Sequence, residues 1–142
     1  MEQFELERKF FLLADDDGDD AEIFAEALEK ASPDTSFLRV EDGHKVLNYL
    51  SDTRNARPDI IFLDLNMPEM NGWQCLARLK NDMYFKDIPV IIYSTSSHPR
   101  DREIAHHLGA ATFLTKPADF RTLIEKLRQI ATNPEGQYSP EQ

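Results

Sequence analysis

The sequence predicts an α/β fold, a doubly wound open sheet of five parallel strands with helices on both faces. Short apolar runs typical of strands alternate with longer segments in which apolar residues recur at helical spacing. Two runs, Ile60–Leu63 and Val90–Tyr93, are apolar at every position, as strands buried on both faces of a parallel sheet are. A closed barrel needs eight strand–helix units, so the open sheet is favoured.

The strands are predicted where short apolar runs are followed by polar or turn-forming residues. They cover Phe10–Ala14, Ser36–Val40, Asp59–Leu63, Val90–Ser94 and Thr112–Thr115. The first helix is predicted at Asp20–Ala31, because Asp19 and Asp20 can cap the free backbone N–H groups at its start. Ser32-Pro33 then stops it, since proline cannot continue a helix.

Four further helices are predicted from apolar residues spaced three or four apart. Two begin after Gly43 and Gly72, and the next is closed by Gly109, a residue suited to the left-handed conformation that often ends helices. The apolar faces of these three helices are Val46, Leu47 and Leu50; Trp73, Leu76 and Leu79; and Ile104, Ala105 and Leu108. The last helix, near Asp119–Ala131, has the clearest apolar stripe.

Length and charge limit the classes of function. The 142 residues fit one domain, predicted at 1–132 with an ordered core from about residue 8, a short flexible tail at 133–142 and no output domain. The 26 acidic and 16 basic residues give a net charge of −10, which argues against direct binding to nucleic acid or to an anionic membrane. The single cysteine, Cys75, and the lack of a long apolar run or secretory signal predict a cytoplasmic protein.

Polar side chains follow four of the predicted strands, at the edge where doubly wound sheets bind ligands. They are Asp15-Asp16-Asp17, Asp64, Ser94-Thr95 and Lys116-Pro117. Clustered carboxylates repel one another unless a cation lies between them, and Mg²⁺ prefers such oxygen ligands. A lysine and a hydroxyl beside the metal suit the anionic oxygens of a phosphoryl group. A carboxylate in the ring can itself act as a nucleophile and form an acyl phosphate.

Each of these residues, taken alone, has an ordinary structural explanation. An acidic loop often caps a helix, an aspartate after a strand often lies in a turn, and a lone lysine is usually a surface residue. The occurrence of suitable residues at four strand ends is what favours a functional site.

The residues at these strand ends resemble the motifs of the response-regulator receiver domains of two-component signalling, of the stand-alone CheY-like type. The matching segments, within about Phe10 to Ala131, are Phe11–Asp17, Ile61–Gly72, Ile88–Ser94 and Phe113–Pro117. The resemblance implies a flavodoxin-like (βα)5 fold with strand order 2-1-3-4-5.

The resemblance also assigns roles to individual residues. Asp64 matches the phosphoacceptor, and Lys116 matches the lysine that contacts the phosphoryl group. Asp15 and Asp16 match the acidic pair that holds Mg²⁺ (or Mn²⁺), to which Asp64 and the backbone carbonyl of Asn66 also contribute. Ser94 matches the switch hydroxyl and Phe113 the switch aromatic residue, while the Lys116–Pro117 peptide is expected to be cis.

The implied function is phosphoryl transfer to Asp64 from a phosphohistidine on a sensor histidine kinase or a histidine phosphotransfer protein. Ser94 would then bind the phosphoryl group and Phe113 would rotate inward. This movement would change the face formed by the fourth helix, fifth strand and fifth helix, which controls a downstream protein target or forms a homodimer. Such a protein assists its own phosphorylation and dephosphorylation but is not otherwise an enzyme.

One position departs from the family pattern, and three other classes of function compete. Thr95 stands where the family mostly has a smaller residue, and we hypothesise that its bulk slows loss of the phosphoryl group.

The three competing classes each fit the sequence less well. A haloacid-dehalogenase-type phosphatase expects a second aspartate two positions after the nucleophile, where this chain has Asn66. A flavodoxin-like FMN binder needs a phosphate loop that the run Asp15 to Asp20 would repel, and a phosphorylation-independent receiver-like scaffold has no need of the full set of site residues.

Overall fold

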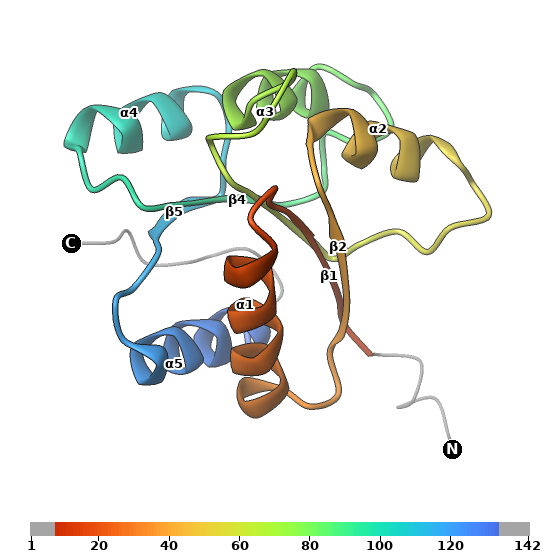
Figure 1. The fold of residues 1–142 in the computed structure, drawn as a ribbon. Helices are drawn as coiled ribbons and strands as arrows, with labels where there is room; N and C mark the ends of the chain where they lie inside the picture. The colour runs from red at the N-terminus through yellow and green to blue at the C-terminus, as the bar shows by residue number, and fades with distance from the viewer. Residues whose placement is uncertain (1–7, 134–142) are drawn as a thin grey trace.

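The computed structural model describes residues 8–133, which form an open parallel sheet with helices on both faces (Figure 1). The strands are β1 (Phe10–Ala14), β2 (Ser36–Val40), β3 (Ile60–Leu63), β4 (Val90–Ser94) and β5 (Thr112–Thr115). The helices are α1 (Gly18–Ala31), α2 (Gly43–Ser51), α3 (Gly72–Lys80), α4 (Pro99–His107) and α5 (Phe120–Ala131). The strand order is β2-β1-β3-β4-β5 with every pair parallel, which confirms the predicted fold.

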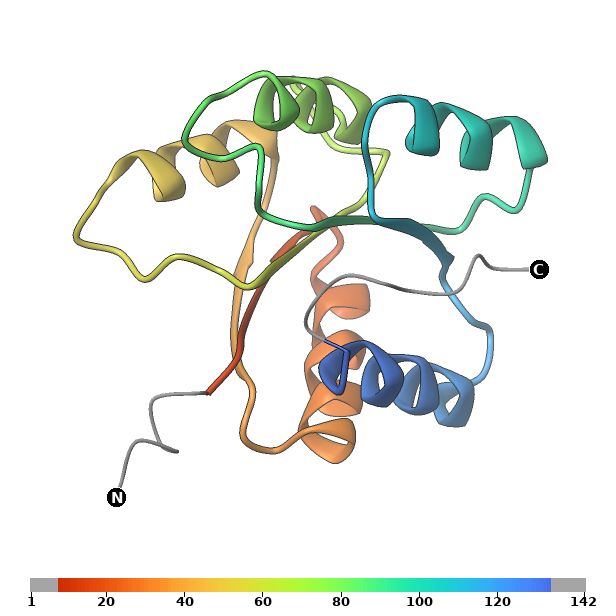
Figure 2. The ribbon, with the colours of Figure 1, turned by 180° about the vertical axis from the view of Figure 1, so that it is seen from behind.

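The helices form two layers, with α1 and α5 on one face of the sheet and α2, α3 and α4 on the other (Figures 1 and 2). Alternate residues of β1 point into the two layers: Phe11 and Leu13 pack with α1 and α5, and Leu12 and Ala14 pack with the other three helices. All four side chains are fully buried. Because both faces are covered, the inner strands are apolar at every position instead of alternating.

The aromatic side chains between the sheet and α1 form one connected group. The Phe24 ring of α1 lies 5.0 Å from Phe62 on β3 and 5.4 Å from Tyr93 on β4, measured between ring centroids, and both pairs meet edge to face. Burial of one such side chain contributes roughly 1.5–3 kcal/mol. This packing fixes α1, and therefore the acidic loop that precedes it, against the middle of the sheet.

Helix α1 begins two residues earlier than predicted. Its N-cap is Asp17, whose carboxylate accepts hydrogen bonds from the backbone N–H groups of Asp19 and Asp20 at 2.9 and 3.2 Å. The prediction that Asp19 and Asp20 cap the helix is therefore wrong, because Asp17 already occupies the extended N-cap conformation. Asp20 lies inside the first turn of α1, and its carboxylate bonds the Lys116 side chain instead of the helix start.

Two other details differ from expectation or fall outside the structure. Residues 8–133 contain no cis peptide bond, so the expected cis Lys116–Pro117 bond is wrong, in keeping with the general preference of X–Pro bonds for the trans form. The tail predicted at 133–142 lies, except for Asn133, outside the described residues.

The predicted end of α4 is confirmed. Gly109 adopts the left-handed conformation after this helix, with φ of 98°.

Candidate phosphoryl-transfer site

The polar residues that follow β1, β3, β4 and β5 meet at the carboxyl edge of the sheet. The strand register places them there, because Ala14 pairs with Leu63, and Ser94 pairs with Thr115. Two backbone bonds extend the sheet past these pairs: Asp64 N–H donates to the Ala14 carbonyl at 3.0 Å, and Lys116 N–H donates to the Ser94 carbonyl at 2.7 Å. Residues that are up to 101 positions apart in the chain are thereby adjacent.

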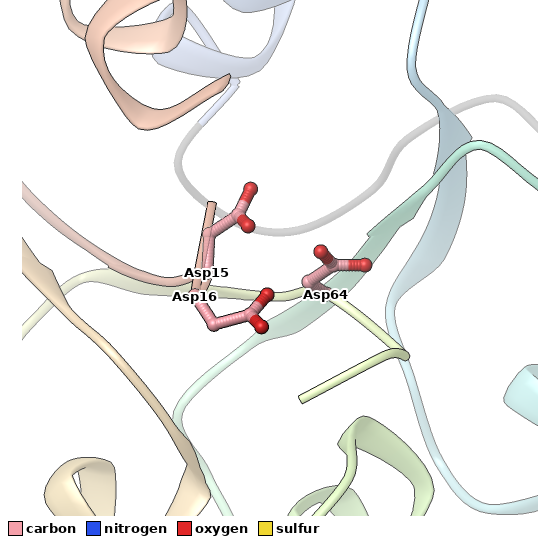
Figure 3. A group of neighbouring side chains, drawn as sticks. All are labelled: Asp15, Asp16 and Asp64. Atoms are coloured by element: carbon pink, nitrogen blue, oxygen red, sulfur yellow. The ribbon is translucent and has the colours of Figure 1, made fainter. Parts of the chain in front are cut away.

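Three carboxylates form a compact group at this edge. Asp15, Asp16 and Asp64 each offer an oxygen, and the three oxygens lie within 4.8 Å of one another (Figure 3). Asp15 is fully buried and Asp64 is 6% exposed, whereas Asp16 is open to solvent. Oxygen donors with one side open to water suit a hard cation that keeps part of its hydration shell, as Mg²⁺ does. The residues present therefore fit a divalent metal.

Asn66 and Asp17 donate backbone hydrogen bonds to this group. The Asn66 N–H points to Asp64 Oδ1 at 3.4 Å, and the Asp17 N–H donates to Asp15 Oδ1 at 3.0 Å. The Arg39 side chain of β2 donates from Nε to the Asp15 backbone carbonyl at 2.9 Å. These bonds hold the acidic loop and the two buried carboxylates in a defined orientation.

The Lys116 ammonium group is bonded to three carboxylates. Its Nζ lies 3.0 Å from Asp15 Oδ2, 3.2 Å from Asp64 Oδ2 and 2.9 Å from Asp20 Oδ2. Burial alone would lower the pKa of Lys116, but the hydrogen bond to Asp20 and the charges of Asp64 and Asp15 outweigh burial and raise it. Lys116 is therefore a permanent positive charge at neutral pH.

Asp20 is a site residue that the sequence analysis missed. It does not follow a strand, and only the path of α1 brings its carboxylate to Lys116. The sequence offers only a weak signal for it, because the run Asp15 to Asp20 contains five aspartates that the sequence alone does not distinguish.

Asp64 is harder to ionise than an ordinary aspartate. Burial raises its pKa, the charge of Lys116 opposes this increase, and the neighbouring Asp15 raises it further, to about 6. In the absence of a bound metal ion, the ionised Asp64 carboxylate therefore destabilises the folded protein.

Ser94 is buried at the end of β4, and its hydroxyl is already engaged. The Ser96 N–H donates to Ser94 Oγ at 3.2 Å, while Ser94 is only 1% exposed. A hydroxyl has one proton and two lone pairs, so accepting this bond leaves its proton able to bind an oxygen at the site. Two further bonds fix the loop that follows: Thr115 Oγ1 donates to the Ser96 carbonyl at 2.9 Å, and Ser96 Oγ donates to Asp101 Oδ2 at 2.5 Å.

The ring of Phe113 is buried in this structure, with 4% of its surface exposed. The guanidinium of Arg102, on α4, lies 5.2 Å from the ring centroid, and Arg102 also bonds Thr115 Oγ1 at 2.9 Å. The expected inward rotation of Phe113 does not start from this conformation, because the ring is already packed inside. Arg102 connects α4 to β5 directly over the aromatic residue.

A polar crevice of about 490 Å³ lies between the loop after β3 and the loop after β4. Thr95 lines it and is exposed, opposite Asn66, Met67 and Trp73. Thr95 is therefore at the entrance from which solvent approaches this part of the site. Trp73 is half-buried and packs against the core on the α2–α3–α4 side, as predicted.

The backbone after Asp64 is held by the start of α3. A side-chain carbon on Gly72 would lie 2.4 Å from the Asp64 carbonyl oxygen and 2.9 Å from the Leu65 Cα, closer than real contacts allow. Gly72 N–H instead donates to the Leu65 carbonyl at 3.1 Å. Asn71 and Gln74 close the helix start with a capping box. Only glycine at position 72 permits this approach.

The fold and the acidic site are those of a receiver domain, and comparison with known proteins agrees. The sequence model of the response regulator receiver domain family matches residues 11–128. The chain belongs to this family. Helices of the length and apolarity needed to cross a membrane do not occur between residues 8 and 133.

Similar proteins include stand-alone regulators. Response regulator Rcp1 of Synechocystis sp. is 29% identical over 126 residues, which cover 86% of each protein. Protein PilH of Pseudomonas aeruginosa is 33% identical over 94 residues, covering 62% of this chain and 78% of PilH.

Solved structures are similar over nearly the whole chain. The phosphorylated cyanobacterial phytochrome response regulator RcpA has a TM-score of 0.82 at 29% identity, covering 93% of this chain and 97% of RcpA. The Mn²⁺-bound form of Rcp1 has a TM-score of 0.78 at 26% identity, covering 94% and 99%. These likenesses support the receiver fold and are consistent with a divalent cation at the acidic trio.

Proposed function

We propose that the chain accepts a phosphoryl group on Asp64 from a phosphohistidine of a sensor histidine kinase or a histidine phosphotransfer protein. An Asp64 oxygen forms a bond to phosphorus while the bond from phosphorus to the imidazole nitrogen breaks and its electron pair stays on the nitrogen. The imidazole leaves neutral when its other ring nitrogen carries a proton. The observation that carries the proposal is the Lys116 ammonium at 3.2 Å from Asp64 beside the buried Asp15.

The chain's own residues contribute position and charge. Lys116 lies beside the Asp64 carboxylate, where it can neutralise the anionic oxygens of the phosphoryl group that Asp64 attacks, and Ser94 offers a hydroxyl from the neighbouring strand. Asp15, Asp16, Asp64 and the backbone carbonyl of Asn66 would hold Mg²⁺ or Mn²⁺. When bound, that cation supplies neutralisation of the phosphoryl oxygens.

Phosphorylation would act as a ligand that favours one of two pre-existing conformations. Ser94 binds the phosphoryl group through its hydroxyl proton, which draws the loop after β4 inward. Because Thr115 and Arg102 tie that loop to β5 and α4, the movement reaches the face formed by α4, β5 and α5. This face is the proposed contact for a downstream protein or for a second copy of the chain. Phe113 on β5 is the aromatic residue proposed to take part in the switch.

The donor class is suggested by three response regulators of similar structure. RcpA is a cyanobacterial phytochrome response regulator, RPA3017 acts in red light signaling of R. palustris, and RtBRR is a bacteriophytochrome response regulator. A histidine kinase linked to a phytochrome is therefore the first donor to test. The acidic charge of the chain favours a donor with a neutral or basic docking surface.

The proposal includes several expected absences. The protein acts in the cytoplasm, binds no nucleic acid directly, does not insert into a membrane, and turns over no substrate beyond its own acyl phosphate. A steady release of phosphate from small phosphate esters would instead favour the phosphatase alternative.

The test is labelling of the purified protein by acetyl phosphate with Mg²⁺, followed by intact mass. We expect one added phosphoryl group on the wild type and none on Asp64→Asn. Asp34→Asn, at an exposed position in the turn between α1 and β2, is the matched control and should label normally. Labelling that persists in Asp64→Asn would show that the acceptor is misassigned.

A further inference from the structure

Asp20 makes the shortest of the three bonds to the Lys116 ammonium. Its Oδ2 lies 2.9 Å from Nζ, against 3.0 Å for Asp15 and 3.2 Å for Asp64. An ammonium group has three protons, and in this arrangement each has a carboxylate acceptor. A phosphoryl oxygen that binds Lys116 must therefore compete with a carboxylate that already holds it.

Asp20 differs from the other two partners in its position. The Asp15 side chain is fully buried and that of Asp64 is 9% exposed, whereas that of Asp20 is 37% exposed. It lies in the first turn of α1, with its carboxylate partly open to solvent. Its charge can therefore act on an anion that approaches Lys116 from solvent.

The charge balance of the site depends on this residue. The site contains four carboxylates, those of Asp15, Asp16, Asp20 and Asp64, and one ammonium group, that of Lys116. With a divalent cation bound, the net charge of this set is negative when Asp20 is counted and zero when it is not. Arg39 adds a positive charge nearby, but its bond goes to the Asp15 backbone carbonyl and not to the carboxylates that hold Lys116.

We infer that Asp20 is a positioning and specificity-determining residue that disfavours small dianionic phosphodonors relative to donors with fewer negative charges. It holds the Lys116 ammonium in a bond that a phosphoryl oxygen must displace, and it adds a negative charge beside that ammonium, which weakens the capture of a free anion. The inference rests on the proposed phosphoacceptor function and adds a preference for one donor class.

The test compares initial labelling rates for two small donors of different charge, acetyl phosphate as a dianion and phosphoramidate with one negative charge fewer. The proteins are the wild type, Asp20→Asn, Asp20→Glu and Asp19→Asn, each at saturating Mg²⁺ determined by its own titration. Asp19 is exposed in the same helical turn, so Asp19→Asn removes an equal charge one residue away from the Lys116 contact. Circular dichroism checks folding, and Asp20→Ala is the second variant if Asp20→Asn is unfolded.

We expect Asp20→Asn to label about five-fold faster than the wild type with acetyl phosphate at low salt, and about two-fold faster with phosphoramidate. The gain should shrink at high salt, because screening weakens the repulsion of a free anion. Asp20→Glu should stay close to the wild type, and Asp19→Asn should change the rate less than two-fold.

Equal or slower labelling of Asp20→Asn with both donors would overturn the inference, as would an acceleration that is the same for both donors or for Asp19→Asn. These outcomes would leave the function of Asp64 intact. A wild type that neither donor labels would instead count against the phosphoacceptor function itself, so the two failures are distinguishable.

Discussion

The Lys116 ammonium lies 3.2 Å from Asp64 Oδ2, yet the pKa of Asp64 is raised to about 6. Burial is the largest cause, and the attraction of Lys116 does not cancel it because that ammonium is shared with Asp15 and Asp20. A carboxylate destabilised in this way gains by binding a cation. The same destabilisation should be measurable as a loss of folding stability in metal-free protein.

The first prediction is that Asp64→Asn stabilises the metal-free protein at pH 7.5 by about 1–2 kcal/mol. Because the folded-state pKa is raised from 3.8 to about 6, the folded state binds more protons between these values, and stability falls as pH rises through that window. The advantage of the variant should therefore be greatest above pH 6 and shrink toward pH 4. Urea unfolding in chelator measures it, and a less stable variant at pH 7.5 would contradict the stated cause.

The second prediction concerns the metal. Mg²⁺ should raise the unfolding temperature of the wild type, and Asp16→Asn should remove most of that increase while barely changing the metal-free stability, because Asp16 is exposed. Apparent affinity should fall as the pH drops below about 6, where a proton on Asp64 competes with the cation. The single tryptophan, Trp73, lines the adjacent crevice, and its fluorescence reports the titration. Full retention of the Mg²⁺ effect in Asp16→Asn would place the metal elsewhere.

The third prediction tests Gly72. Gly72→Ala should destabilise the fold by about 1–3 kcal/mol and slow labelling of Asp64, since the new methyl group would press on the Asp64 carbonyl. Gly18→Ala is the control: its nearest neighbour would be Arg39 Nη1 at 4.0 Å, so stability and labelling should be preserved. Normal labelling of a fully stable Gly72→Ala protein would show that this close approach is dispensable.

The fourth prediction separates phosphorylation from switching. Ser94→Ala should still be labelled on Asp64, but hydrogen exchange in α4 and β5 should no longer change on phosphorylation. The variant should also lose about 0.5–1.5 kcal/mol of stability, because the Ser96 N–H loses its acceptor. Ser94→Thr keeps the hydroxyl and should retain the response. A normal exchange response in Ser94→Ala would remove this hydroxyl from the switch.

The fifth prediction concerns the lifetime of the acyl phosphate. Thr95→Ala should shorten its half-life several-fold: Thr95 lines the crevice beside Leu65 and Ser94, and we expect a smaller side chain there to admit more water toward Asp64. Ser97→Ala, at an exposed position two residues further along the same loop, should leave the half-life unchanged. An unchanged or longer half-life in Thr95→Ala would reject the hypothesis.

The sequence by itself determined the sheet and most of the residues at its carboxyl edge. Apolar runs such as Ile60–Leu63 specify doubly buried parallel strands, and the ends of such strands meet at one edge, so Asp15, Asp64, Ser94 and Lys116 could be grouped from sequence. Short-range rules were less reliable: Asp17, and not Asp19 or Asp20, caps α1. The choice between adjacent aspartates depends on the exact residue at which the chain leaves β1 and turns into the helix.

Only the tertiary structure decided the third partner of Lys116 and the position of Phe113. Asp20 and Lys116 are 96 residues apart, and their contact depends on the angle at which α1 packs on Phe62 and Tyr93. The burial of Phe113 depends on how α4, through Arg102, lies over β5. Strand periodicity fixes which residues reach an edge, whereas helix orientation follows from the packing of many side chains at once and is not encoded in any short segment.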